Sequence, residues 1–82
     1  MNEISDLSRL KEGQCAIVRS INLSGDMRRR LQDLGLICGT RVKCLYKNPK
    51  GNTGAFCVRG ASIALRDCDS QFIGIEICCG RE

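Results

Sequence analysis

The order of apolar and polar residues along the chain predicts a set of short β-strands joined by polar turns. In residues 15–21 the side chains alternate, with Cys15, Ile17 and Ile21 expected on one face of a strand. Further segments have the length and composition of strands and are separated by turns rich in Gly, Asn and Asp. These segments are residues 42–47, 55–59, 62–66 and 72–79.

Two shorter segments accompany these strands. Ile4, Leu7 and Leu10 recur at helical or turn spacing, which predicts an apolar lead-in before the first strand. Residues 67–70 predict a single helical turn with Asp67 as its cap. The pattern as a whole favours a mainly all-β fold, a small antiparallel barrel of about five strands with a short inserted helix. Closure of the sheet is expected because it removes unpaired strand edges.

Residues 27–34 predict the inserted helix. Met27, Leu31 and Leu34 recur at the helical period, so they are expected to lie on one face and to pack against the barrel. Gly35 follows, where a left-handed residue commonly ends a helix.

Three consecutive arginines occupy the first turn of this helix. Cations there oppose the helix dipole, at a cost of roughly a few tenths of a kcal/mol each when exposed. We therefore interpret the helix as a partner-binding surface, whose arginines face an acidic partner while its leucines pack inward. Its residues are Arg28, Arg29, Arg30, Leu31 and Leu34. The alternative is an ordinary solvated helix in which Arg29 and Arg30 pair with Asp33.

Length and charge limit the range of functions. The 82 residues predict one domain, 1–82, and no apolar stretch is long enough to cross a bilayer. No basic-then-apolar export signal opens the chain, so we expect a cytoplasmic protein without direct membrane insertion. The net charge of +4 permits an acidic partner without requiring a nucleic acid.

The seven cysteines leave two interpretations open. The first treats them as reduced, mostly buried small hydrophobes, since the count is odd and no export signal precedes them. The second is a transition-metal-binding, metal-responsive module in which Cys thiolates hold iron or zinc weakly, with self-association of the chain. The absence of His and of any C-x-x-C spacing weighs against a metal site. No required cofactor is expected.

Catalysis and nucleic-acid binding are disfavoured by missing residue types. A Cys nucleophile lacks a His base, and no glycine-rich phosphate loop is present. Arg41, Lys43, Arg59 and Arg66 form a basic stripe, but Tyr46 alone could stack a base beside it. An SH3-type site for proline-rich peptides is disfavoured by the same scarcity of aromatic residues.

Several local patterns occur together in the order and spacing of a known family. They are R-R-L-x-x-L-G-L at Arg29–Leu36, C-G-T-x-V at Cys38–Val42, N-P-K-G at Asn48–Gly51, V-R-G at Val58–Gly60 and I-A-L-R at Ile63–Arg66. From about Leu7 to Ile77 the chain resembles the FeoA family of small ferrous iron transport proteins. It departs from that family at Cys38, where proline is usual, and in its larger number of cysteines.

The resemblance implies an SH3-like barrel with a helix inserted between early strands. It also implies a non-catalytic accessory protein that docks on the cytosolic part, or GTPase domain, of the membrane ferrous iron transporter FeoB. Similar SH3-like domains form the C-terminal part of iron-dependent repressors.

Overall fold

The structure, a computed structural model, describes residues 3–48, 50 and 52–79. Its elements in chain order are β1 (Glu3–Asp6), the 3-10 helix η1 (Leu7–Arg9), β2 (Cys15–Ile21), α1 (Gly25–Asp33), β3 (Arg41–Asn48), β4 (Thr53–Val58), β5 (Ala61–Arg66), α2 (Asp67–Ser70) and β6 (Ile73–Cys79). The strands form one antiparallel sheet in the order β1-β6-β2-β3-β4-β5. The predicted mainly-β fold with a short inserted helix is confirmed.

The sheet has six strands, one more than expected, and its hydrogen-bonded order ends at β1 and β5. Hydrogen bonds between strands therefore do not close it within the described residues, which corrects the expected closure. The two ends instead meet through η1 and α2, which pack against each other. The Lys47 ammonium adds a link, since it donates to the Ser8 carbonyl (2.8 Å) and to the Asp67 carboxylate (3.2 Å). Asp67 is thus the first residue of α2 and an ion-pair partner, and Arg66 takes the cap position.

The core lies on the concave side of the curled sheet. Alternate residues of β4 and of the first half of β3 point into it, and Phe56 is completely buried. In β2 the alternation changes part-way, because a bulge at Arg19 adds one residue opposite β6. Val18 and Ile21 consequently share the buried face, and the prediction that Cys15, Ile17 and Ile21 lie together is wrong.

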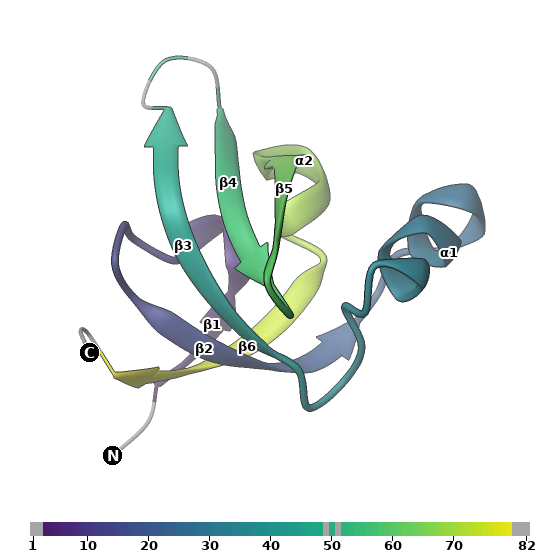
Figure 1. Cartoon of the computed structure of the whole chain (residues 1–82), viewed down its shortest axis with the longest axis horizontal. Helices are drawn as coiled ribbons and strands as arrows, with labels where there is room; N and C mark the ends of the chain where they lie inside the picture. The colour runs from purple at the N-terminus through teal and green to yellow at the C-terminus, as the bar shows by residue number, and fades with distance from the viewer. Residues whose placement is uncertain (1–2, 49, 51, 80–82) are drawn as a thin grey trace.

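The helix α1 stands off one side of the sheet, beyond the end of β2 (Figure 1). Leu31 attaches it to the core and is 1% exposed, and Leu36, just after the helix, is completely buried. Leu34 is 39% exposed, so the expectation that it packs inward is wrong. The helix ends at Asp33, and the left-handed Gly35 (φ 96°) then turns the chain so that Leu36 enters the core instead.

The long turn expected over residues 48–54 joins β3 to β4, with the strands extending further into it than predicted. Pro49 and Gly51 of the N-P-K-G pattern lie outside the described residues.

Candidate functional site

The three arginines of α1 have different environments. Arg28 turns back toward its own chain, and its Nη1 donates to the carbonyls of Ile21 (2.6 Å) and Leu23 (3.3 Å). These two oxygens belong to the end of β2 and the loop that follows it. Arg28 therefore ties the first turn of α1 to the sheet and holds the helix at its angle. Arg28 was expected to face a partner together with Arg29 and Arg30, whereas its bonds give it a positioning role.

Arg29 and Arg30 are exposed. Within the described ranges neither side chain has a hydrogen bond or ion pair. The pairing with Asp33 that a solvated helix would use is not formed there. Both guanidinium groups are therefore available to an acidic partner.

An apolar strip continues from the end of α1 into the next turn. Leu34 is 39% exposed and Ile37 is 46% exposed. Arginine next to exposed aliphatic side chains is a common composition for protein–protein interfaces. Leu34 was expected in the core and Ile37 was not predicted at this surface, because apolar periodicity alone does not show where the helix ends.

The turn after α1 has a defined geometry. Thr40 N donates to the Ile37 carbonyl (3.0 Å), and Gly39 between them has φ 92°, as in a type II turn. The Thr40 hydroxyl donates to the Gly35 carbonyl (3.0 Å) and accepts from Ile37 N (3.2 Å). Cys38 occupies the turn position that favours proline, which explains why the family pattern has proline there.

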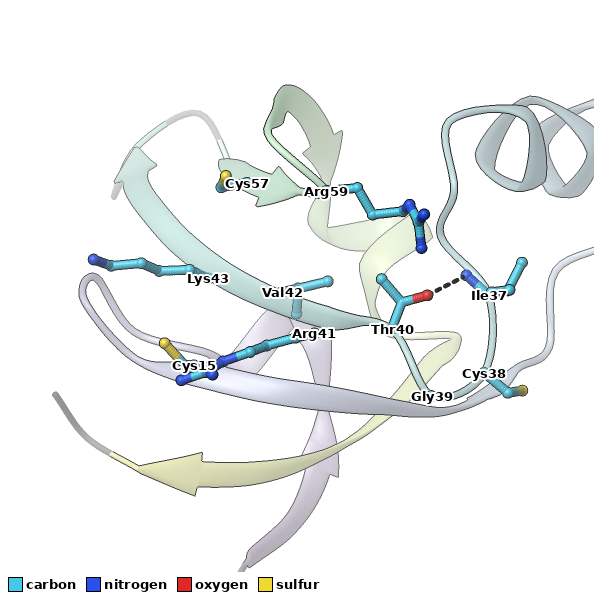
Figure 2. A pocket seen from close by; sticks show the side chains of 10 residues that line it. All are labelled: Cys15, Ile37, Cys38, Gly39, Thr40, Arg41, Val42, Lys43, Cys57 and Arg59. Carbon is cyan, nitrogen blue, oxygen red and sulfur yellow. Dashed lines mark hydrogen bonds between the residues drawn. The ribbon is translucent and has the colours of Figure 1, made fainter. Parts of the chain in front are cut away.

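A groove of about 670 Å³ lies between this turn and the sheet. Side chains from β2, β3, β4 and the β4–β5 turn complete its lining (Figure 2). The strand register accounts for this convergence, since Lys43 of β3 is opposite Cys15 on one side and Cys57 on the other. Residues far apart in the sequence thus form one row across three strands.

Arg59 reaches the groove from a constrained backbone position. It has φ 51°, in the left-handed region, and Gly60 follows with φ 86°. Together they form the two-residue type I′ turn that joins β4 to β5, a turn that usually carries Asn and Gly. The Arg59 side chain then crosses Gly35 and extends toward Ile37 and Thr40 (Figure 2).

The basic stripe seen in the sequence is only partly one surface. Arg41, Lys43 and Arg59 line the groove, whereas Arg66 does not. No Asp or Glu is among the described lining residues, and none of them is aromatic. The groove is therefore cationic with an apolar floor, and it offers no stacking platform for a base.

Six cysteines have side chains that the structure describes, and these six are free thiols that differ in exposure. Cys15 and Cys44 are buried, Cys57 and Cys78 are half-buried, and Cys38 and Cys68 are exposed, so the expectation of mostly buried cysteines holds only in part. Burial raises the pKa of the Cys44 thiol, and the nearby Lys47 offsets part of that effect.

Among the residues that the structure describes, no three His, Cys, Asp or Glu side chains gather where they could hold an ion. The metal-binding interpretation thus has no defined ligand set in this part of the chain.

None of the described helices is both long and apolar enough to pass through a bilayer.

Comparison with known proteins identifies the family. Residues 6–77 match the model of the FeoA domain. A FeoA protein from Chlorobium tepidum is 35% identical, over 94% of this chain and 73% of its own, with a TM-score of 0.84. A FeoA-like protein from Clostridium acetobutylicum is 26% identical, over 100% of this chain and 95% of its own, with a TM-score of 0.81.

A third structure, of Stenotrophomonas maltophilia FeoA with zinc, is 28% identical over 85% of this chain and 87% of its own. Its TM-score is 0.73, and it is described as an SH3 domain protein and a candidate ferrous iron transport activating factor. No curated protein sequence matches the chain. The expected SH3-like architecture is confirmed by these structures, and the family match over most of the chain shows that it belongs to the FeoA family.

Proposed function

We propose that this chain is a non-catalytic accessory protein of ferrous iron uptake that docks through α1 on the cytosolic part of a FeoB-type transporter. Membership of the FeoA family supports the link to ferrous iron transport. The partner and the contact surface are our inference from the shape and charge of α1.

One observation carries the docking proposal: α1 stands off the sheet and presents two cations without partners in the described structure. These are Arg29 and Arg30, and Leu34 lies exposed one turn further along. An arginine pair beside an aliphatic residue provides both charge complementarity and desolvated contact area.

The attachment of α1 makes it a stiff docking element. Leu31 is buried in the core, and Arg28 bonds the first turn to the preceding backbone. A helix held at a fixed angle loses little conformational entropy on binding, which favours affinity. The transporter's equilibrium between states then shifts only as far as the chain binds one state more tightly than the other.

Binding between the immobilised cytosolic domain of a FeoB-type transporter and the purified full chain tests this proposal. Arg29→Ala/Arg30→Ala should weaken affinity about tenfold or more at low salt. Complementary charges across an interface speed association of the two proteins and fix their relative orientation. Lys11→Ala/Arg66→Ala is the matched control, since it removes the same charge from exposed positions outside α1.

The control should change affinity by less than about twofold. Equal losses of affinity in the two double variants would show that only the net charge of the chain matters, and would contradict docking through α1. Absence of binding by the unmodified chain would contradict the proposed partner.

A further inference from the structure

We propose that the groove beside the α1–β3 turn binds an extended acidic peptide segment of a partner protein. Its carboxylates would pair with Arg59 and Lys43, and an aliphatic side chain of the peptide would lie against the exposed Ile37. This inference does not rest on the proposed docking through α1, because the residues that carry it belong to the sheet and its turns.

The charge of the groove indicates an anionic ligand. Lys43 and Arg59 have no hydrogen bond or ion pair to other residues in the described part of the chain. No carboxylate lines the groove there to neutralise them. Cations gathered in a hollow with an apolar floor produce a local positive potential that attracts and orients acidic groups.

The backbone of Arg59 provides a second, independent observation. A type I′ turn favours Asn or Gly at this position, yet the chain carries arginine at φ 51°. Unfavourable backbone conformations are concentrated at binding and catalytic sites, where the rest of the structure holds them. Here the aliphatic part of Arg59 rests on Gly35, which directs the guanidinium over the groove.

The shape of the groove distinguishes an extended peptide from other anions. Lys43 lies at one side of the set of lining residues, and Arg59 lies farther along it toward Ile37 and Thr40, with Val42 between the two (Figure 2). A volume of about 670 Å³ is far more than one inorganic anion fills. None of the described lining residues is aromatic, which disfavours stacked nucleic-acid bases and proline-rich ligands.

Fluorescence anisotropy tests the inference with a short fluorescein-labelled peptide that alternates glutamate with leucine. The full chain should bind it, and a glutamine–leucine peptide of equal length should bind at least about tenfold more weakly. Arg59→Asn/Lys43→Gln should reduce affinity for the acidic peptide by about tenfold or more. Asn suits the turn, so this variant is expected to remain folded, which thermal unfolding verifies.

Arg66→Gln/Lys11→Gln removes equal charge outside the groove and should alter affinity by less than about twofold. The inference is overturned if the unmodified chain does not bind, or if both double variants lose affinity equally. Equal binding of inorganic phosphate or of a short oligonucleotide, in competition with the labelled peptide, would also overturn it. Loss of peptide binding in Arg29→Ala/Arg30→Ala alone would place the ligand on α1 instead.

Discussion

The side chain of Arg59 lies over the α-carbon of Gly35, so closely that a methyl group at residue 35 would overlap the aliphatic part of the arginine. This contact joins the β4–β5 turn to the end of α1. It also relates two patterns that are separate in the sequence, L-G-L after the helix and V-R-G in the hairpin turn. The absence of a side chain at Gly35 leaves room for Arg59, and the left-handed backbone at residue 35 favours glycine independently.

Gly35→Ala should therefore destabilise the fold for two reasons. The residue has φ 96°, which is strained for alanine, and its Cβ would collide with Arg59. We expect a loss of about 1–3 kcal/mol in the free energy of unfolding, measured by denaturant titration.

The collision can be separated from the strain by a double-mutant cycle. In an Arg59→Gly background the same Gly35→Ala change should cost less, because only the backbone strain remains. Equal costs in the two backgrounds would show that the two residues are not coupled.

Arg59→Asn should make the protein more stable and less able to bind an acidic peptide. Asn tolerates the left-handed conformation at φ 51°, so relief of strain should add about 1 kcal/mol to the free energy of unfolding. Thermal unfolding and the anisotropy assay measure the two effects on the same sample. A fall in stability would show that the arginine supports the turn and would contradict the strain argument.

Arg28 and Arg30 should respond differently to replacement by alanine. Arg28→Ala removes donors from the Ile21 and Leu23 carbonyls and should lower the free energy of unfolding by about 1 kcal/mol. Arg30→Ala, at an exposed position, should change it by less than about 0.5 kcal/mol. Chemical denaturation of both variants checks this, and equal stabilities would remove the positioning role of Arg28.

Alkaline pH should weaken the contribution of Cys44. Because burial raises the pKa of this thiol, folding favours its neutral form. The contribution of the neutral Cys44 thiol to the free energy of unfolding is complete below the ordinary thiol pKa. It is lost as pH rises through the raised pKa of Cys44 in the folded protein. The stability advantage of the unmodified chain over Cys44→Ala should therefore shrink above about pH 9 in denaturant titrations. A difference that stays constant or grows with pH would contradict it.

The strands were predictable where polar and apolar residues alternate without interruption. Residues 42–44 and 73–77 followed the expected faces, with Cys44 and Ile75 buried. Tyr46 was expected on the face of Cys44 but is 54% exposed, because the pairing of β3 with β4 shifts register between Cys44 and Tyr46. The prediction failed where the alternation is interrupted. Arg19 adds a bulge that moves Ile21 to the buried face, and nothing in the spacing of apolar residues marks such an insertion.

Strand β1 was missed for a related reason. Ile4 and Leu7 are spaced as in a helix, but Ile4 lies on a strand and Leu7 opens a 3-10 helix. A helical spacing arises there from a junction between two elements. Pairing with β6, a contact across most of the chain, decides the structure of residues 3–6.

The candidate site was only half visible in the sequence. The arginine run marked α1, but the separate role of Arg28 depends on carbonyls that become available where β2 ends. The groove depends on strand register, which brings Cys15, Lys43 and Cys57 into one row. Arginine in the first position of a hairpin turn, where Asn is usual, was the one local signal for Arg59.

The central claim is that α1 is the surface that contacts the transporter, and NMR shift mapping tests it most directly. Amide resonances of the ¹⁵N-labelled chain would be followed while the cytosolic domain of a FeoB-type transporter is added. We predict that the largest changes occur at Arg29, Arg30, Leu34 and Ile37. Changes confined to β5 and α2, with the α1 resonances unmoved at saturation, would contradict it.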